Sequence, residues 1–251
     1  MNSGTLDIAI ANRIATLTFS HPASNSLPGD LLYKMTSAFN DLAADSEVQV
    51  IVLKSDGDRA FCAGASFDEL LAINNSEQGT KFFMGFAHLI NSMRTCGKII
   101  IGAVQGKAVG GGVGLVAACD YVVASEEASV KLSELFIGIG AFVIEPVVNR
   151  KIGKAAFCNL TLEATEWHSA TWAHSNGLFS KITDTKEHML DEVDALANRL
   201  ASYHPEALFE MKKVFWEGTD HWDILLAERA EISGALVLTD FTKNTLLKWK
   251  K

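Results

Sequence analysis

The chain has 251 residues, of which 48% are hydrophobic and 21% are charged. This length fits one large α/β domain with an appendage, or two smaller domains, and the composition excludes a disordered or fibrous chain. Lys and Arg number 22 and Asp and Glu number 30, so the formal net charge is -8. Nucleic-acid binding is disfavoured, because affinity for a duplex depends on basic residues that neutralise its phosphates.

No segment has the pattern of a signal peptide or of a membrane span. The first 19 residues lack a basic stretch followed by an unbroken apolar run, and the longest apolar run, 99–118, contains six glycines, a Gln and a Lys. Such a run is too polar for a membrane helix. Four cysteines without a C-x-x-C pair predict buried, reduced thiols: Cys62, Cys96, Cys119 and Cys158. We therefore expect a cytoplasmic protein.

The first part of the chain alternates predicted strands with predicted helices. Two short strands are joined by a turn at Asn12, and a helix is expected to begin near Phe67. In chain order, the apolar patterns predict strands over 6–10 and 14–19, a helix over 31–44, a strand over 49–54, a helix over 82–93, a strand over 98–104, a helix over 115–119 and a strand over 121–124. This alternation predicts parallel crossovers, and hence an α/β body over residues 1–188.

The last part of the chain, 189–251, reads as a helical region. An amphipathic helix is predicted over 189–203, Pro205 marks the start of a second over 206–216, and a third spans 222–237. A basic stretch over 241–251 closes the chain. We predict an α/β core over 1–188, which contains the functional site, followed by a helical region over 189–251.

Glycine is concentrated in one segment. Six of the 19 glycines lie between Gly102 and Gly114, including the triplet Gly110-Gly111-Gly112. Consecutive glycines let a ligand approach main-chain N–H groups closely, and because the run leads into a helix, the helix dipole there favours negative charge. The alternative is that the glycines serve only the close packing of a helix on a strand.

Part of the run also fits a dinucleotide-binding fingerprint. Residues 112–117 match G-x-G-x-x-A, and Glu134 lies 20 residues beyond Gly114. The fingerprint requires a strand directly before its first glycine, however, and it normally opens the first βαβ unit. A dinucleotide-binding protein is therefore a remote alternative. Seven histidines show no ligand spacing, and we expect no metal site.

A second segment of small residues has the same character. Ala63, Gly64 and Ala65 follow a predicted strand and turn and precede the helix expected near Phe67. Two segments with unobstructed N–H groups favour a pair of donors that converge on one oxygen, which is the requirement of an oxyanion hole.

These segments resemble those of the crotonase (enoyl-CoA hydratase/isomerase) superfamily. Phe61-Cys62-Ala63-Gly64-Ala65 is similar to its F-x-A-G-A-D motif, and 102–112 with Asp120 is similar to its A-V-x-G-x-A-x-G-G-G…C-D motif. The resemblance covers essentially the whole chain. It implies an α/β fold of stacked ββα turns, with a C-terminal helical region that supports a homotrimer or a dimer of trimers.

The resemblance also implies a coenzyme A thioester as substrate, with no separate cofactor. Its carbonyl oxygen would lie between the backbone N–H groups of Ala65 and Gly111, which stabilise an enolate while Glu134 acts as acid/base. Further residues then become candidate substrate contacts: Ala63, Gly64, Phe67, Gly110, Gly114 and Phe142.

The chain departs from the family pattern at several positions. Family hydratases usually carry two glutamates, but the first position is Gly114 here and only Glu134 remains. Two carboxylates hold and split a water, whereas one suffices to move a proton between carbons. The departure favours an isomerase or another enolate reaction and leaves hydration of a 2-enoyl-CoA open. A non-catalytic acyl-CoA binder is the alternative.

Two further departures and one further acidic residue bear on the pocket. Ser66 replaces the usual Asp of the first motif, and Gly138-Ile139-Gly140-Ala141-Phe142 replaces a common G-x-x-P-G stretch, which predicts a reshaped pocket floor. Glu145 precedes Pro146 at an expected helix start. It is either a second acid of the pocket or a partner of the helix dipole in the first turn.

Overall fold

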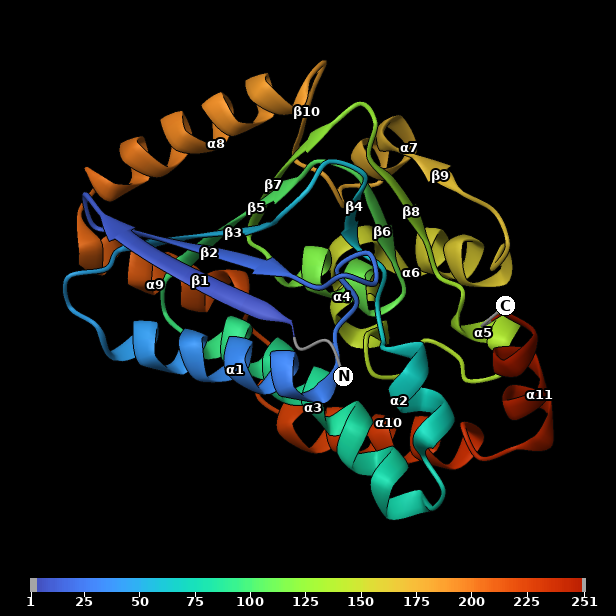
Figure 1. Ribbon diagram of the computed structural model, residues 1–251. Helices are drawn as coiled ribbons and strands as arrows, with labels where there is room; N and C mark the ends of the chain where they lie inside the picture. Colours follow the sequence, from blue (N-terminus) through green and yellow to red (C-terminus); the bar gives the residue numbers. More distant parts are fainter. Residues whose placement is uncertain (1–3, 250–251) are drawn as a thin grey trace.

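The computed structural model describes residues 4–249, which form two sheets with helices packed around them (Figure 1). The larger sheet has six strands in the order β1-β2-β3-β5-β7-β10. The hairpin β1/β2 is antiparallel and the remaining neighbours are parallel. Its strands are β1 (Thr5–Ala11), β2 (Ile14–Ser20), β3 (Val50–Ser55), β5 (Ile99–Val104), β7 (Tyr121–Ser125) and β10 (Lys181–Thr183).

The smaller sheet has four short strands in the order β4-β6-β8-β9, of which β9 runs antiparallel to β8. They are β4 (Ala60–Cys62), β6 (Lys107–Val109), β8 (Ser129–Lys131) and β9 (His168–Ser169). Each pass of the chain gives one strand to the large sheet and the next to the small sheet, as in β3/β4, β5/β6 and β7/β8, and then enters a helix. This repeat confirms the expected stacked ββα turns.

The helices cover both faces of the large sheet. They are α1 (Gly29–Ala44), α2 (Phe67–Ala72), α3 (Ser76–Thr95), α4 (Gly111–Ala118), α5 (Glu134–Ile137), α6 (Glu145–Leu162), α7 (Ala170–Ser175), α8 (Lys186–Ala201), α9 (Pro205–Phe215), α10 (Trp222–Leu236) and α11 (Asp240–Trp249). Among these described helices, none is long and apolar enough to cross a membrane. The last two residues of the basic stretch, Lys250 and Lys251, lie outside the described residues.

Alternation along β3 shows how the large sheet is buried on both sides. Ile51 and Leu53 pack into the main core, whereas Val50 and Val52 pack against α8 on the opposite face. In Figure 1, α8 lies above the large sheet and α1, α3 and α10 lie below it. A parallel strand covered on both faces reads as a continuous apolar run, which is the pattern of this segment in the sequence.

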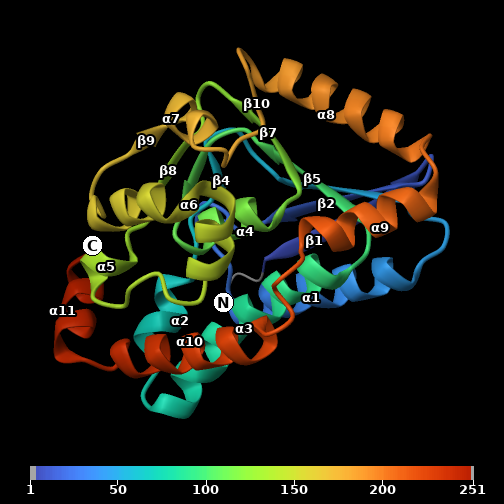
Figure 2. The ribbon, with the colours of Figure 1, turned by 180° about the vertical axis from the view of Figure 1, so that it is seen from behind.

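Helices α3 and α10 cross in backbone contact, side by side in both views (Figures 1 and 2). A Cβ atom on Gly79 of α3 would lie 2.5 Å from the carbonyl oxygen of Gly234, and one on Gly234 would lie 2.5 Å from the backbone N of Thr80. No side chain fits at either position, so the two glycines fix the place of α10 relative to α3. This crossing brings the C-terminal part of the chain against the core.

Most long elements agree with the sequence prediction, although only the start of α6 was predicted; the start of α2 at Phe67 is confirmed, and most other short elements were missed. The turn at Asn12 is confirmed, with positive φ at Asn12 and Arg13, as a two-residue hairpin turn requires. Helix α4 begins at Gly111, four residues before the predicted start. The strands β4, β6, β8 and β9 have two or three residues each, which is too short for a periodic pattern.

The prediction of buried thiols is wrong for one cysteine. Cys62, Cys96 and Cys119 are buried, but Cys158 is exposed on α6. Its neighbours Ala156 and Leu160 are buried, and the helical period therefore turns the side chain between them away from the core.

A buried ion pair ties α9 to the start of β7. Lys212 is 1% exposed, and its Nζ lies 2.6 Å from Asp120 Oδ2. Asp120 also accepts hydrogen bonds from the backbone N of Ile100 at 2.8 Å and from Trp216 Nε1 at 2.8 Å. Every oxygen of this carboxylate thus has a donor, which is the condition under which a buried charge pair is tolerated.

We expect Lys212→Met to lower the free energy of unfolding by about 3 kcal/mol, because it leaves the Asp120 carboxylate buried without its cation. Urea denaturation of the two proteins measures this difference. Lys213→Met is the matched control, since Lys213 is exposed and pairs with Glu210 at the surface. It should change the free energy by less than about 1 kcal/mol. Equal effects of the two substitutions would contradict the prediction.

Candidate active site

A cavity of about 70 Å³ lies between the glycine run, α3, α5 and the segment that leads into α6. Most of its walls are apolar, and within residues 4–249 its side chains include one ionisable group, Glu134. The lining residues are Ala63, Gly64, Ala65, Phe67, Leu70, Phe83, Phe86, Val109, Gly110, Gly111, Ser133, Glu134, Ile137, Ile139, Gly140, Ala141, Phe142, Val143, Ile144 and Ser233.

One wall is the segment that follows β4. Gly64 has φ +81°, a conformation that glycine adopts without strain. The backbone N of Leu27 donates to the Gly64 carbonyl at 2.7 Å, and the N of Ala63 donates to the Ser24 carbonyl at 3.1 Å. These bonds fix the peptide before Ala65. Within residues 4–249 the N–H of Ala65 has no hydrogen-bond acceptor, so it is free to bind a ligand oxygen.

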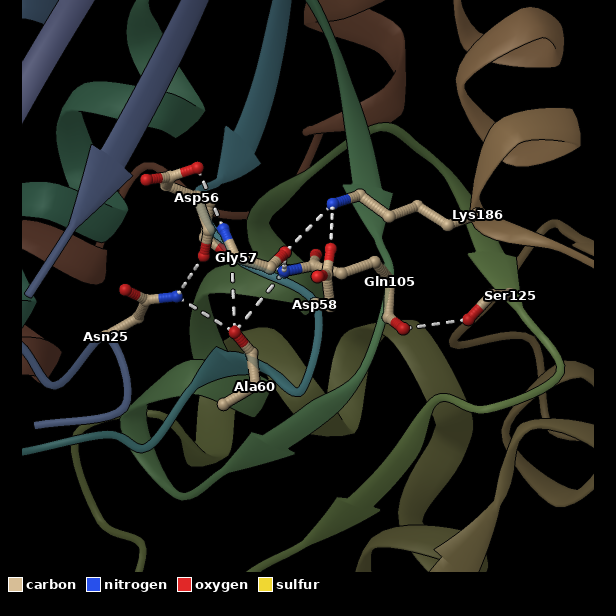
Figure 3. Close-up of polar contacts among 9 residues, drawn as sticks. Asn25, Asp56, Gly57, Asp58, Ala60, Gln105, Ser125 and Lys186 are labelled. Carbon is tan, nitrogen blue, oxygen red and sulfur yellow. Dashed lines mark hydrogen bonds and ion pairs between the residues drawn. The ribbon is translucent and has the colours of Figure 1, made fainter.

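The loop before β4 is held by side chains from three other parts of the chain (Figure 3). Asn25 Nδ2 donates to the carbonyls of Asp56 at 2.8 Å and Ala60 at 2.9 Å. Gln105 Nε2 donates to the Gly57 carbonyl at 3.1 Å, and Lys186 Nζ donates to the same carbonyl at 3.0 Å. This network stiffens the approach to the segment that carries Ala65.

The opposite wall is the glycine triplet at the start of α4. Gly110 has φ +54°, and Gly111 is the first residue of the helix. A Cβ atom on Gly64 would lie 2.7 Å from the Val109 carbonyl and 3.2 Å from the backbone N of Gly111, so the two segments are in contact. The Gly111 N–H also has no acceptor within the described part of the chain. It is one of the unsatisfied donors at a helix N-terminus.

Glu134, the first residue of α5, faces Gly110. A Cβ atom on Gly110 would lie 2.5 Å from Glu134 Oε1, so only glycine leaves room for this carboxylate. The Oε2 atom is inaccessible to solvent and has no hydrogen-bond partner in residues 4–249. Burial without a countercharge raises the pKa of Glu134 to about 7. A carboxyl group of this kind accepts and releases protons near neutral pH.

Gly114 is the predicted contact that does not line the cavity. It lies one turn inside α4, and a Cβ atom there would overlap the side chain of Ile144. Ile144 instead lines the cavity. The place at which the family resemblance predicts a further carboxylate is therefore occupied by an aliphatic side chain from the segment before α6. The other eight predicted site residues line the cavity: Ala63, Gly64, Ala65, Phe67, Gly110, Gly111, Glu134 and Phe142.

The residues that flank the site have structural partners. Ser66 caps α2 by accepting from the backbone N of Glu69 at 3.4 Å. Glu145 lies in the first turn of α6, accepts from Asn149 Nδ2 at 3.0 Å and does not line the cavity. Of its two predicted roles, the structure thus supports the first-turn position.

The structure also argues against the dinucleotide fingerprint. Gly112 and Gly114 lie inside α4 rather than in a turn before it. A Cβ atom on Gly112 would lie 2.6 Å from the Cys62 carbonyl, so this glycine serves the packing of α4 on β4. Within the described residues, no group of three or more His, Cys, Asp or Glu side chains is placed to hold a metal ion.

The sequence prediction missed several lining residues, among them Ile144, Ser133 and Ser233. Ile144 and Ser133 are close in sequence to predicted residues. Ser233 belongs to α10, about 100 residues beyond Glu134, and reaches the cavity through the crossing of α10 with α3. No local pattern marks such a residue, since its place depends on the contact between Gly79 and Gly234.

Comparison with known proteins identifies the family. The family model for enoyl-CoA hydratase/isomerase matches residues 9–232. The chain belongs to the enoyl-CoA hydratase/isomerase family. It is 33% identical, over 73% of its length and 72% of the relative's, to a Thermus thermophilus protein named as an enoyl-CoA hydratase. It is 28% identical to a short-chain-enoyl-CoA hydratase of Clostridium acetobutylicum, over 93% and 90% of the two chains.

Other members of the enoyl-CoA hydratase/isomerase family extend the comparison to a different reaction and to the fold. A peroxisomal Delta(3,5)-Delta(2,4)-dienoyl-CoA isomerase of Arabidopsis thaliana is 28% identical over 76% of this chain and 72% of its own. The crystal structure of an enoyl-CoA hydratase from Bacillus halodurans superposes with a TM-score of 0.89 at 21% identity, over 97% and 99% of the two chains. This likeness confirms the predicted fold. The chain is an enzyme of a family that includes both hydratases and isomerases.

Proposed function

We propose that the protein acts on the coenzyme A thioester of an unsaturated acid and moves its double bond from between C3 and C4 to between C2 and C3. The observation that carries this proposal is the composition of the cavity. One carboxylate, Glu134, lines the same cavity as two N–H groups without acceptors, those of Ala65 and Gly111, and most of the other lining side chains are apolar. The arrangement provides one acid/base and one oxyanion hole.

The reaction needs one group to carry one proton. The Glu134 carboxylate takes a proton from C2 of a 3-enoyl thioester, and the electron pair moves onto the thioester oxygen as a dienolate. The N–H groups of Ala65 and Gly111 hydrogen-bond that oxygen. Protonated Glu134 then returns the proton at C4, which leaves the double bond between C2 and C3. A pKa near 7 suits both steps, because the group is neither too weak a base nor too weak an acid.

Hydration of a 2-enoyl thioester is the second candidate function. It is favoured by the names of the relatives from Thermus thermophilus and Clostridium acetobutylicum. Against it stands Ile144, which fills the space beside Gly114, so the cavity has one carboxylate to position the water and activate it. The single carboxylate therefore makes the double-bond shift our first choice.

Two thioesters distinguish the candidates. We expect 3-hexenoyl-CoA to gain the absorbance of the conjugated enone in the presence of the protein, because the product is the 2-enoyl thioester. We expect 2-hexenoyl-CoA to lose that absorbance at least tenfold more slowly. Rapid loss from 2-hexenoyl-CoA with no gain from 3-hexenoyl-CoA would contradict the isomerase proposal and favour hydration. Tight binding of both thioesters without turnover would favour a non-catalytic acyl-CoA binder.

We also propose that the chain assembles as a homotrimer, or a dimer of trimers, through its C-terminal helical region, with the core over 1–188 holding the site. Support comes from α9, where Phe209, Met211, Val214 and Phe215 are exposed, and from the start of α10, where Ile224 is exposed. Apolar surface of this extent marks an interaction surface more often than a solvated face. Light scattering of the purified protein measures the mass of the assembly.

A further inference from the structure

Ser233 is the residue that α10 contributes to the lining of the cavity. It is 1% exposed. Its hydroxyl forms no hydrogen bond within residues 4–249, although it lies at the wall of a cavity. This combination is uncommon, since buried polar side chains in folded proteins nearly always have a partner.

Two hydroxyls on other helices bond to the preceding turn, whereas Thr161 Oγ1 of α6 is also buried without a partner in the described part of the chain. Ser92 Oγ donates to the Leu89 carbonyl at 2.8 Å, and Thr36 Oγ1 donates to the Leu32 carbonyl at 2.8 Å. Serine and threonine inside helices usually satisfy themselves on the preceding turn in this way. The Ser233 hydroxyl makes no such bond, so it remains available to a group inside the cavity.

The position of Ser233 is fixed by its neighbour. Gly234 is in backbone contact with Gly79 and Thr80 of α3. Because position 234 has no side chain, α10 packs directly on the backbone of α3 and cannot move closer to it. Phe83 and Phe86 of the same α3 also line the cavity. The hydroxyl is therefore a fixed polar point in a wall that is otherwise aromatic and aliphatic.

The surroundings of Ser233 define the chemistry of its partner. Within the described residues the cavity lining contains no Lys, Arg or His, and its one ionisable side chain is Glu134. A carboxylate or phosphate on the ligand would enter the cavity without a countercharge and beside an acid, which is costly in an apolar site. A neutral oxygen, such as a hydroxyl or a keto group, would satisfy Ser233 without that cost.

We propose that Ser233 is a specificity-determining residue that hydrogen-bonds a neutral oxygen substituent on the acyl chain of the substrate. The preferred substrate is then a hydroxyacyl or ketoacyl thioester of coenzyme A, not one with a plain alkyl chain. This inference rests on the proposed function for the identity of the thioester, but it concerns binding and not the reaction.

The test compares saturated thioesters, whose binding needs no turnover. Hexanoyl-CoA and its 4-, 5- and 6-hydroxy derivatives are titrated against the wild type and the Ser233→Ala variant by calorimetry. We expect at least one hydroxy derivative to bind the wild type about tenfold more tightly than hexanoyl-CoA. The alkyl chain of hexanoyl-CoA leaves the buried Ser233 hydroxyl without a hydrogen-bond partner, whereas a hydroxy derivative supplies one. In Ser233→Ala that preference should disappear, while the affinity for hexanoyl-CoA stays the same or rises.

Ser92→Ala is the matched control, because Ser92 is equally a buried helical serine but bonds to its own helix and does not line the cavity. It should keep the preference and lose stability to urea, whereas Ser233→Ala should lose none. A wild type that binds all four thioesters equally would overturn the proposal for Ser233 and leave the isomerase proposal intact. Loss of stability in Ser233→Ala as large as in Ser92→Ala would also overturn it. If none of the four thioesters binds, both proposals fail.

Discussion

Glu134→Gln is expected to reduce the turnover number by at least about a thousandfold while the variant still binds acyl-CoA. The substitution keeps the size of the side chain and the space beside Gly110, but it removes the group that accepts and returns the proton. General acid/base catalysis contributes about 10²–10⁴-fold, and here one residue serves both steps. Stopped assays with 3-hexenoyl-CoA measure the turnover, and calorimetry with hexanoyl-CoA measures the binding.

Glu145→Gln is the control for this variant. Glu145 lies in the first turn of α6, is half-buried and does not line the cavity. Its substitution should change the turnover number by less than about threefold. If Glu134→Gln turned over at the rate of the wild type, another residue would have to carry the proton, and the role proposed for Glu134 would be wrong.

The raised pKa of Glu134 gives the wild type a characteristic pH dependence. The carboxylate form takes the proton from C2, so kcat/KM should rise with pH through an apparent pKa of about 7 and then level off. An ordinary exposed glutamate would place this rise about three pH units lower. A profile that is flat between pH 5 and 8 would contradict the buried environment of the carboxylate.

The free energy of unfolding should depend on the same pKa, but it should fall as pH rises, whereas kcat/KM should increase. Because the folded state holds the Glu134 proton up to about pH 7 and the unfolded state releases it near 4.5, the folded protein binds more protons within this window. The wild type should therefore lose stability relative to Glu134→Gln as pH rises from 4.5 to 7, by about 3 kcal/mol in total. Urea denaturation of both proteins at several pH values gives the difference.

How far the sequence predicts this molecule depends on the length of each element. The buried strand around Val50 and Val52 and the amphipathic α8 carry enough periodic residues to be recognised. The strands β4, β6 and β8 have three residues each and pair with strands that are far away in the chain. Apolar periodicity does not indicate that 61–65 and 102–112 belong to one site. That prediction came from the resemblance of both segments to family motifs.

The residues of the cavity also fall into those that the sequence predicts and those that it does not. Gly110 was predicted because it lies inside a contiguous motif, and Glu134 because the family resemblance implies a glutamate 20 residues beyond position 114. Ile144 and Ser233 were not, since their effect depends on contacts with Gly114 and with Gly79 that only the folded chain establishes. The glycine at 114 was visible in the sequence as a missing carboxylate. That an isoleucine occupies its place was not visible, and this contact decides whether a second carboxylate has room.

Gly114→Glu is therefore expected to lower the free energy of unfolding by about 5 kcal/mol. The new side chain overlaps Ile144, overpacking of a core costs about 1–3 kcal/mol, and a carboxylate buried without a partner adds several more. Ile144→Ala alone should cost about 2–4 kcal/mol through the cavity it leaves. If the two sites are in contact as described, their effects will not add.

The double variant Gly114→Glu with Ile144→Ala tests that contact. We expect it to be more stable than Gly114→Glu by about 2 kcal/mol, because the removal of Ile144 makes room for the carboxylate and opens it to the cavity; coupling of this size is typical of residues in direct contact. With a second carboxylate beside Glu134, hydration of 2-hexenoyl-CoA relative to isomerisation of 3-hexenoyl-CoA should rise at least tenfold over the wild type. Additive losses of stability would show that Ile144 does not fill the place of the missing carboxylate. Restored packing without a gain in hydration would show that the single carboxylate is not what limits the wild type to the double-bond shift.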